Sequence, residues 1–232
     1  MLCYFLGESI LVLGGKEEDY IGLSPVEIHL NNDGSTGLER CRIEEYGGRL
    51  DSVGDFLDDK FVVCGGSDYG TLKQDCEVIH ETGTQTFNMS AKRRDASHVK
   101  LNQSLMWITG GSETQTKSLN STEFVTVNGS TAGVTLPFTV KRHCMVRYQP
   151  NAIFLIGGEL NGKTYSKKTW IIDPTNGFNM TKGPTLNQGR EFHSCEKMKD
   201  EYGNVLVIVA GGDDLNSIEV LNITHSSSWF KG

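Results

Sequence analysis

A short apolar run that ends in two glycines occurs five times in this chain, and this internal repeat constrains the fold more than any other feature. The first glycines of successive copies are 51, 45, 47 and 54 residues apart. A fixed period of roughly 20–50 residues is typical of proteins in which one small structural unit stacks on its copies. The doubled glycines are Gly14-Gly15, Gly65-Gly66, Gly110-Gly111, Gly157-Gly158 and Gly211-Gly212.

Each apolar run has the composition of a buried β-strand. Residues 61–64 (FVVC) and 153–156 (IFLI) are mostly β-branched or aromatic, which favours a strand covered on both faces. Polar, turn-rich residues follow each doubled glycine, at 16–23, 67–74, 112–118, 159–166 and 213–216. An alternating strand comes next. Because each unit holds about four strands and no segment keeps a helical apolar period, the sequence predicts an all-β fold.

Other features recur at later places in the unit. The alternating strand carries a glutamate in four units, at Glu27, Glu77, Glu123 and Glu219. The segment Phe-Asn-Met-Ser at 87–90 matches Phe-Asn-Met-Thr at 178–181. A basic residue near a histidine precedes the glycine strand in three units, and the second unit has Arg49 without a histidine. The three pairs are Arg94 with His98, Arg142 with His143, and Arg190 with His193.

This order of features resembles the kelch repeat, whose units form the blades of a β-propeller. The resemblance covers nearly the whole chain and implies one domain, residues 1–232, of five four-stranded blades. The approximate blades are residues 1–40, 41–90, 91–136, 137–186 and 187–232. The first unit lacks the Arg/His strand, and five units are fewer than the six usual in this family. An incomplete ring and a true five-bladed ring are therefore both open.

The resemblance implies that the doubled glycines and the Arg/His pairs are structural, with each Arg and His joining its blade to the next by hydrogen bonds. An alternative uses His98, His143 and His193, which fall at similar places in consecutive units. If their strands are innermost, these imidazoles would converge near the axis and bind a metal. The structural interpretation needs no such ion, and we expect neither a metal nor another cofactor.

Six cysteines are too sparse for a small disulfide scaffold and include no close pair for zinc. Cys64 and Cys76 flank one predicted hairpin loop, so the hairpin would bring them opposite each other. A disulfide there and two ordinary buried thiols are both consistent with the sequence. Cys144 and Cys195 occupy matching places in neighbouring units, which favours equivalent packing positions over a bond.

Six of the 14 asparagines begin the Asn-x-Ser/Thr pattern, where chance predicts roughly two. The candidate N-glycosylation sites are Asn88, Asn102, Asn120, Asn128, Asn179 and Asn222. This excess favours a secreted protein. Residues 1–6 are too short for a signal peptide and lack its basic start. A secreted interpretation therefore requires an incomplete N-terminus, and the chain is otherwise expected to be cytoplasmic.

The charge balance excludes some partners. Twenty-two Lys and Arg residues against 29 Asp and Glu residues give a net charge of −7, so the chain lacks the positive excess that binds nucleic acid. A bilayer-spanning helix needs roughly 20 consecutive apolar residues, whereas the longest runs are residues 1–6 and 205–210. We expect neither a nucleic-acid partner nor membrane insertion.

The kelch resemblance implies a non-catalytic protein–protein interaction module that presents its inter-strand loops to an unidentified protein partner. One alternative is an enzyme on the same scaffold, galactose-oxidase-like or otherwise metal-dependent, although no positions here match the ligands of those oxidases. Another is a fragment of a larger extracellular kelch protein. The paired carboxylates Asp58-Asp59 and Asp213-Asp214 lie in predicted turns, where acidic residues are usual.

Overall fold

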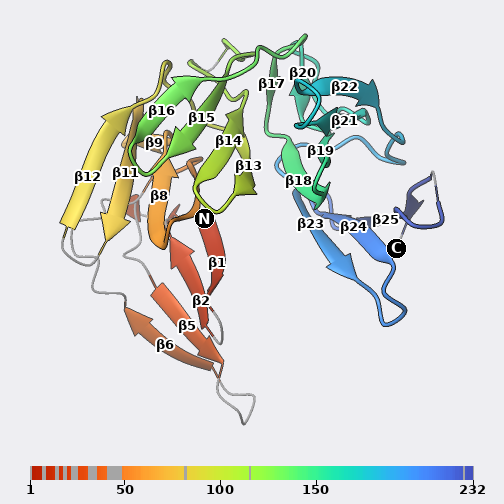
Figure 1. The fold of residues 1–232 in the computed structure, drawn as a ribbon, viewed down its shortest axis with the longest axis horizontal. Helices are drawn as coiled ribbons and strands as arrows, with labels where there is room; N and C mark the ends of the chain where they lie inside the picture. Colours follow the sequence, from red (N-terminus) through yellow and green to blue (C-terminus); the bar gives the residue numbers. More distant parts are fainter. Residues whose placement is uncertain are drawn as a thin grey trace.

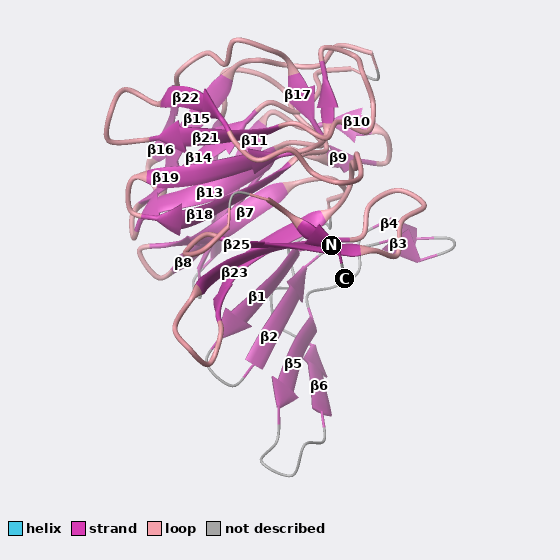
Figure 2. Cartoon of the chain, turned by 90° about the vertical axis from the view of Figure 1, so that its right-hand side faces the viewer, coloured by secondary structure: helices cyan, strands magenta, loops and turns pink. Residues whose placement is uncertain are grey.

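The regular structure of this chain consists of β-strands. The computed structural model describes residues 49–80, 83–114, 116–226 and 228–231, and the backbones of six strands within residues 1–48. Every regular element in these residues is a strand, so the predicted all-β class is confirmed (Figure 2). The described residues include no helix long and apolar enough to cross a membrane.

The strands form five antiparallel four-stranded sheets, each built from strands in chain order. Sheet 1 contains β1 (Leu2–Leu6), β2 (Ser9–Leu13), β5 (Val26–Leu30) and β6 (Thr36–Arg40). Sheet 2 contains β7 (Val53–Leu57), β8 (Lys60–Cys64), β11 (Asp75–His80) and β12 (Gly83–Asn88). Sheet 3 contains β13 (Ser97–Asn102), β14 (Leu105–Thr109), β15 (Thr122–Thr126) and β16 (Gly129–Ala132).

The remaining two sheets follow the same plan. Sheet 4 contains β18 (Cys144–Gln149), β19 (Ala152–Ile156), β21 (Thr169–Asp173) and β22 (Asn179–Lys182). Sheet 5 contains β23 (Ser194–Lys199), β24 (Val205–Ala210), β25 (Ile218–Asn222) and β26 (Phe230–Lys231). Three two-stranded pairs complete the list: β3 (Lys16–Glu17) with β4 (Tyr20–Ile21), β9 (Ser67–Asp68) with β10 (Thr71–Leu72), and β17 (Val140–Lys141) with β20 (Glu159–Leu160).

Successive sheets pack side by side through their first strands. Strand β1 contacts β7, β7 contacts β13, β13 contacts β18, and β18 contacts β23. Each sheet lies within one of the five intervals predicted from the repeat. The series does not close into a ring or barrel, and sheets 1 and 5 flank the open side in Figure 1. The number of propeller blades therefore stays a prediction.

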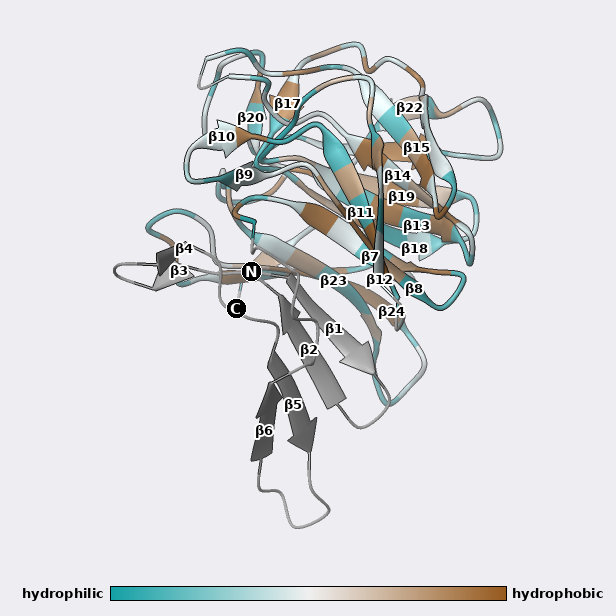
Figure 3. Ribbon diagram, turned by 90° about the vertical axis from the view of Figure 1, so that its left-hand side faces the viewer, coloured by the Kyte–Doolittle hydropathy of each residue, from teal (hydrophilic) through white to brown (hydrophobic). Residues whose placement is uncertain are grey.

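The apolar runs are buried because their two faces pack against different sheets. Successive side chains of a strand point to opposite faces. In β14, Met106 and Ile108 face sheet 2, whereas Trp107 between them faces sheet 4, and all three are fully buried. The hydrophobic segments of Figure 3 lie in central strands such as β14 and β19. A strand that must be apolar on both faces cannot be stable without neighbours on both sides.

Sheet 5 differs because, among the described residues, one of its faces packs against sheet 4 and the other carries exposed apolar side chains. Val207 and Val209 of β24 are fully buried against sheet 4. On the rest of this sheet the exposed apolar side chains include Met198 (45%), Ile218 (45%) and Phe230 (59%). The loss of burial follows from position at the end of the series rather than from a change in residue type.

The sheets have two distinct ends. At one end, here called the Gly-Gly end, each second strand stops at its doubled glycine. The pairs β9/β10 and β17/β20 gather there, at the left of Figure 3. The opposite end, here called the far end, holds the tight turns between the first and second strands and between the third and fourth strands. The glycosylation candidates and the exposed side chains described below are located by these two ends.

Candidate functional site

The doubled glycines are required by backbone conformation and by close approach of the next segment. Gly65 and Gly66 have φ angles of 64° and 82°, a region that L side chains rarely adopt. A Cβ atom on Gly65 would lie 2.3 Å from the Arg93 carbonyl oxygen, and one on Gly66 would lie 2.5 Å from that of Leu50. The pairs at 110–111, 157–158 and 211–212 also have positive φ. Gly14 and Gly15 lie outside the described residues.

The second glycine of each pair hydrogen-bonds to the segment that leads into the next sheet. The N–H groups of Gly66, Gly111 and Gly158 each donate to a carbonyl at 2.8 Å. The acceptors are Arg93, Val140 and Arg190, respectively. These three residues therefore occupy matching positions in the repeat.

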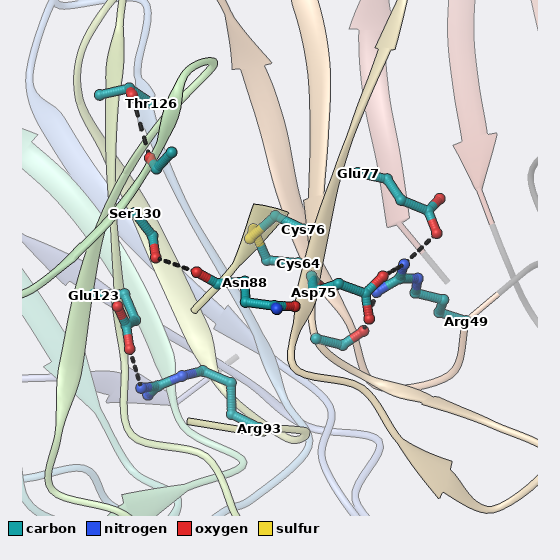
Figure 4. Close-up of a disulfide and its surroundings, with 12 residues drawn as sticks. Arg49, Cys64, Asp75, Cys76, Glu77, Asn88, Arg93, Glu123, Thr126 and Ser130 are labelled. Atoms are coloured by element: carbon teal, nitrogen blue, oxygen red, sulfur yellow. Dashed lines mark hydrogen bonds and ion pairs between the residues drawn. A yellow bond between two sulfur atoms is a disulfide. The ribbon is translucent and has the colours of Figure 1, made fainter. Parts of the chain in front are cut away.

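Two of these matching residues are arginines that also bind the following sheet through their side chains. Nη1 of Arg93 donates to the carbonyls of Gly110 (2.8 Å) and Ser121 (3.1 Å), and its Nη2 donates to Glu123 at 3.1 Å. Arg93 and Glu123 are both buried, and Figure 4 shows their contact. Sheet 3 is thus joined to sheet 2 through the Arg93 carbonyl, while the Arg93 guanidinium is bound within sheet 3.

Arg190 repeats this arrangement in sheet 5. Its Nη1 donates to the carbonyls of Gly211 (2.6 Å) and Ser217 (3.1 Å), and its Nη2 donates to Glu219 at 2.9 Å. In sheet 2, Arg49 bonds the Gly65 carbonyl (3.2 Å) and the carboxylates of Asp75 and Glu77 (Figure 4).

The predicted register of two arginines is wrong. Arg93, not Arg94, matches Arg190, because Arg93 accepts the glycine N–H. Arg142 lies two residues beyond Val140, which holds the matching position in sheet 4. The Arg-to-His spacings of four, one and three residues are unequal, which already indicates that the three pairs do not occupy matching positions. The recurring glutamate was the better guide, because the structure shows it bound to the true matching arginine.

Sheet 4 has lost both members of the arginine–glutamate pair. Val140 stands at the arginine position, and Trp170, paired with Leu155, stands where the other sheets have glutamate. The Trp170 ring stacks on Phe138 with centroids 5.1 Å apart. Replacing both partners of a buried ion pair by apolar groups costs little, whereas removing one leaves an uncompensated charge.

A second chain of backbone hydrogen bonds runs around the mouth of the space between the first strands. Asp51, Asp95, Arg142 and Phe192 have φ angles of 57°, 55°, 57° and 56°. The N–H of Asp95 donates to the Asp51 carbonyl (3.2 Å), that of Arg142 to Asp95 (2.8 Å), and that of Phe192 to Arg142 (3.0 Å). The same turn therefore recurs in sheets 2 to 5 and is bonded from one sheet to the next.

Beneath this mouth lies a cavity of about 840 Å³, lined by β7, β13, β18 and β23. Its wall carries both signs of charge. Asp55 lies 3.8 Å from Lys100 and 3.8 Å from His98. At the mouth, Arg142 lies 3.4 Å from Glu191 and 3.6 Å from Asp95, and its guanidinium stands 4.5 Å from the Phe192 ring centre. Burial raises the pKa of Glu191, and the charge of Arg142 partly opposes this.

The three candidate histidines do not occupy equivalent places. His143 and His193 each follow the matching Val140 or Arg190 by three residues, but His98 belongs two residues further along its strand. Nε2 of His143 lies 2.8 Å from Thr109 Oγ1, and Nε2 of His193 lies 3.1 Å from the Ile156 carbonyl. Within the described residues, no group of three or more His, Cys, Asp or Glu side chains is placed to hold a metal.

The described residues contain two disulfides. Cys64 and Cys76 are directly paired on neighbouring strands of sheet 2 and form the predicted bond, with Cα atoms 4.0 Å apart. Cys144 and Cys195 are also bonded, which corrects the prediction of equivalent packing positions. Cys144 matches Ser194, so the two cysteines are offset by one residue. A one-residue offset reverses the face of a strand, and this allows their sulfur atoms to meet between β18 and β23.

The candidate glycosylation sites fall at both ends of the sheets. Asn102, Asn128, Asn179 and Asn222 lie at the far end, and Asn88 and Asn120 lie at the Gly-Gly end. The matching of 87–90 with 178–181 is therefore wrong. Asn88 pairs with Asp75 at one end of its strand, whereas Asn179 pairs with Asp173 at the other.

The Gly-Gly end carries exposed aromatic side chains that the sequence did not single out. Tyr69, Phe192 and Tyr165 are 74%, 51% and 46% exposed. All three have positive φ, at 44°, 56° and 51°, respectively. The Tyr165 hydroxyl donates to Asp213 at 2.9 Å, and this hydrogen bond raises the pKa of Tyr165. A bulky residue in left-handed backbone is uncommon and is concentrated at functional sites.

No protein-family model matches the chain, and no curated protein matches it.

Removing one partner of the Arg93–Glu123 pair should cost far more than removing both. Arg93→Met leaves the buried Glu123 carboxylate without its cation, and we expect the free energy of unfolding to fall by about 3–5 kcal/mol. The double variant Arg93→Met/Glu123→Met should be more stable than Arg93→Met alone. Urea unfolding followed by circular dichroism measures both. A double variant that loses the sum of the two single losses would contradict this role.

The buried histidines predict instability in acid. Burial lowers the pKa of His143 to about 3 and that of His193 to about 4. An unfolded histidine titrates near ~6.5, so the unfolded state binds more protons below that pH. Stability should therefore fall as the pH drops from about 6.5 toward about 4. We expect the double variant His143→Gln/His193→Gln to show a smaller fall over this range in pH-dependent urea unfolding. Equal falls would contradict the prediction.

The two disulfides should differ in their effect on stability. The closed segments span 51 residues for Cys144–Cys195 and 12 for Cys64–Cys76. On a chain-entropy basis, replacing both cysteines by serine should cost about 4 kcal/mol for the first and about 3 kcal/mol for the second. Thermal and urea unfolding of the two double variants test this order, and the reverse order would overturn it.

Proposed function

We propose that this chain is a kelch-type β-propeller with five blades that acts as a non-catalytic protein-interaction module. The propeller assignment is supported by repetition of the same contacts. The bond from the second glycine to the next segment recurs at three junctions. The positive-φ turn at the mouth recurs in four successive sheets. Repetition of one contact pattern from sheet to sheet is expected when equivalent units are arranged around an axis.

Binding is proposed to occur at the Gly-Gly end, and the exposed aromatic side chains carry this proposal. Tyr69, Tyr165 and Phe192 project from loops on a rigid scaffold of sheets. Arg142 stands against Phe192 at the same surface. Aromatic residues and arginine are enriched where protein partners contribute most binding energy. Loops held by a rigid scaffold are also the usual place for recognition.

The non-catalytic part of the proposal is supported by the use of the histidines. His143 and His193 are buried, have lowered pKa values, and bond Thr109 and the Ile156 carbonyl. Their Nε2 atoms are therefore committed to holding neighbouring sheets together. A general acid or base needs a pKa near the working pH, and these two groups do not meet that requirement.

A comparison of matched surface variants tests the binding face. The double variant Tyr165→Ala/Phe192→Ala removes two exposed side chains from the Gly-Gly end. The control Met198→Ala/Tyr202→Ala removes two from the far-end hairpin between β23 and β24, where these residues are 45% and 81% exposed. Proteins retained on the immobilised chain would be quantified by mass spectrometry.

We expect at least one protein to be retained by the wild type and by the control but lost from the Gly-Gly variant. Identical retention by all three would contradict a binding role for this end. Metal analysis of the purified chain addresses the enzyme alternative. Stoichiometric copper or zinc that disappears in His143→Ala would overturn the non-catalytic assignment.

A further inference from the structure

The six Asn-x-Ser/Thr sites are not spread evenly over the molecule. Asn102 ends β13, next to the turn that leads to β14, and Asn128 lies in the turn between β15 and β16. Asn179 begins β22, and Asn222 ends β25. These four sites therefore gather at the far end of sheets 3, 4 and 5, at the opposite end from Tyr69, Tyr165 and Phe192.

The far-end asparagines have side chains that are able to carry a large substituent. Asn102, Asn128 and Asn179 are exposed, as are Asn88 and Asn120 at the Gly-Gly end, so the far-end sites differ from Asn120 in their hydrogen bonds rather than in exposure. A Cβ atom on Gly129, the residue after Asn128, would meet no atom within 4 Å, so the space around this turn is open. At each site the atom that carries an N-linked glycan is the amide nitrogen Nδ2.

Two of these asparagines hold their turns with the other amide atom. Oδ1 of Asn102 accepts from the Ser104 N–H at 2.9 Å, and Oδ1 of Asn222 accepts from the Thr224 N–H at 2.9 Å. These bonds use the oxygen and leave Nδ2 for substitution. Asn222 is half-buried, but its turn is held by Oδ1 in the same way.

Asn120 at the Gly-Gly end differs from these asparagines because its amide nitrogen takes part in a hydrogen bond. Its Nδ2 donates to the Leu136 carbonyl at 3.3 Å. The same loop supplies the N–H and carbonyl contacts that surround Gly111, where Leu119 donates to the Gly111 carbonyl at 2.8 Å. A glycan on Asn120 would stand within this hydrogen-bonded loop.

A second, independent observation concerns the chemistry of the compartment. The structure contains two disulfides, and one of them joins two sheets. Disulfides form and persist in oxidising environments such as the endoplasmic reticulum and the extracellular space. N-glycosylation is carried out on chains that enter the same compartment.

We propose that N-linked glycans on Asn102, Asn128, Asn179 and Asn222 cover the far end of the sheets and that Asn120 at the Gly-Gly end is not modified. In the transfer, a bond forms between Nδ2 and the anomeric carbon of an oligosaccharide carried on a polyprenyl diphosphate. The bond from that carbon to the phosphate oxygen breaks, polyprenyl diphosphate leaves, and the amide nitrogen loses one proton. Glycosylation of the far end does not depend on protein binding at the Gly-Gly end.

Enzymatic deglycosylation in ¹⁸O-water tests the proposal. The full chain would be produced behind a cleavable signal sequence in insect or human cells. Peptide N-glycosidase converts each glycosylated asparagine to ¹⁸O-labelled aspartate, which peptide mass spectrometry locates. We expect the label at Asn102, Asn128, Asn179 and Asn222 but not at Asn120. Unlabelled far-end sites, or a label at Asn120, would overturn the proposal.

Spontaneous deamidation is the main source of false label, because Asn128 precedes glycine. Asn176 provides the matched control, since it also precedes glycine in an exposed far-end turn but lacks the Ser/Thr two residues later. Label at Asn176 would measure the background. On a denaturing gel, the variant Asn128→Gln should have a lower apparent mass than the wild type by one glycan. After deglycosylation the two proteins should migrate together. Equal apparent masses of the variant and the wild type before deglycosylation would contradict a glycan at Asn128.

Discussion

The structure depends on arginines that serve two sheets at once. The carbonyl of Arg93 accepts the Gly66 N–H of sheet 2, while its guanidinium lies among the carbonyls of Gly110 and Ser121 and the carboxylate of Glu123 in sheet 3. A buried guanidinium is costly unless its donors are paired, so Arg93 holds sheet 3, and Arg190 holds sheet 5, in one position relative to the preceding sheet. Glycine is needed beside it because the Arg93 carbonyl passes too close for a side chain.

The packing of the apolar strands follows from this arrangement. A strand such as β14 places alternate side chains against two different neighbouring sheets, so it is stable only between them. Sheet 5 shows what happens to such strands at the end of the series. A Cβ atom on Gly211 would have no atom of a following sheet within 4 Å, only the Leu215 carbonyl at 3.8 Å. The apolar side chains on that sheet are correspondingly exposed.

The same contacts occupy most of the buried polar side chains described above. His143, His193 and the matching arginines form the hydrogen bonds that join or brace the sheets. The cavity between the first strands is lined by charges of both signs. The exposed aromatic side chains at the Gly-Gly end, such as Tyr69 and Phe192, lie outside these contacts between sheets. Their left-handed backbone is held by the hairpin of Tyr69 and by the Arg142–Phe192 bond at the mouth.

The sequence by itself determined the β class and the five four-stranded units, because strand composition and glycine spacing are local properties. It predicted that one hairpin brings Cys64 and Cys76 together but left a disulfide and two free thiols open, and the structure shows the disulfide. Only the tertiary structure decided that Arg93 rather than Arg94 is the matching arginine, and that Cys144 bonds Cys195. Both depend on a one-residue register between segments far apart in the chain, and such a shift reverses the face of every side chain. The sequence predicted the loops at 67–74 and 159–166, which carry Tyr69 and Tyr165, but it did not predict that these side chains are exposed, because exposure is a property of packing and not of residue type.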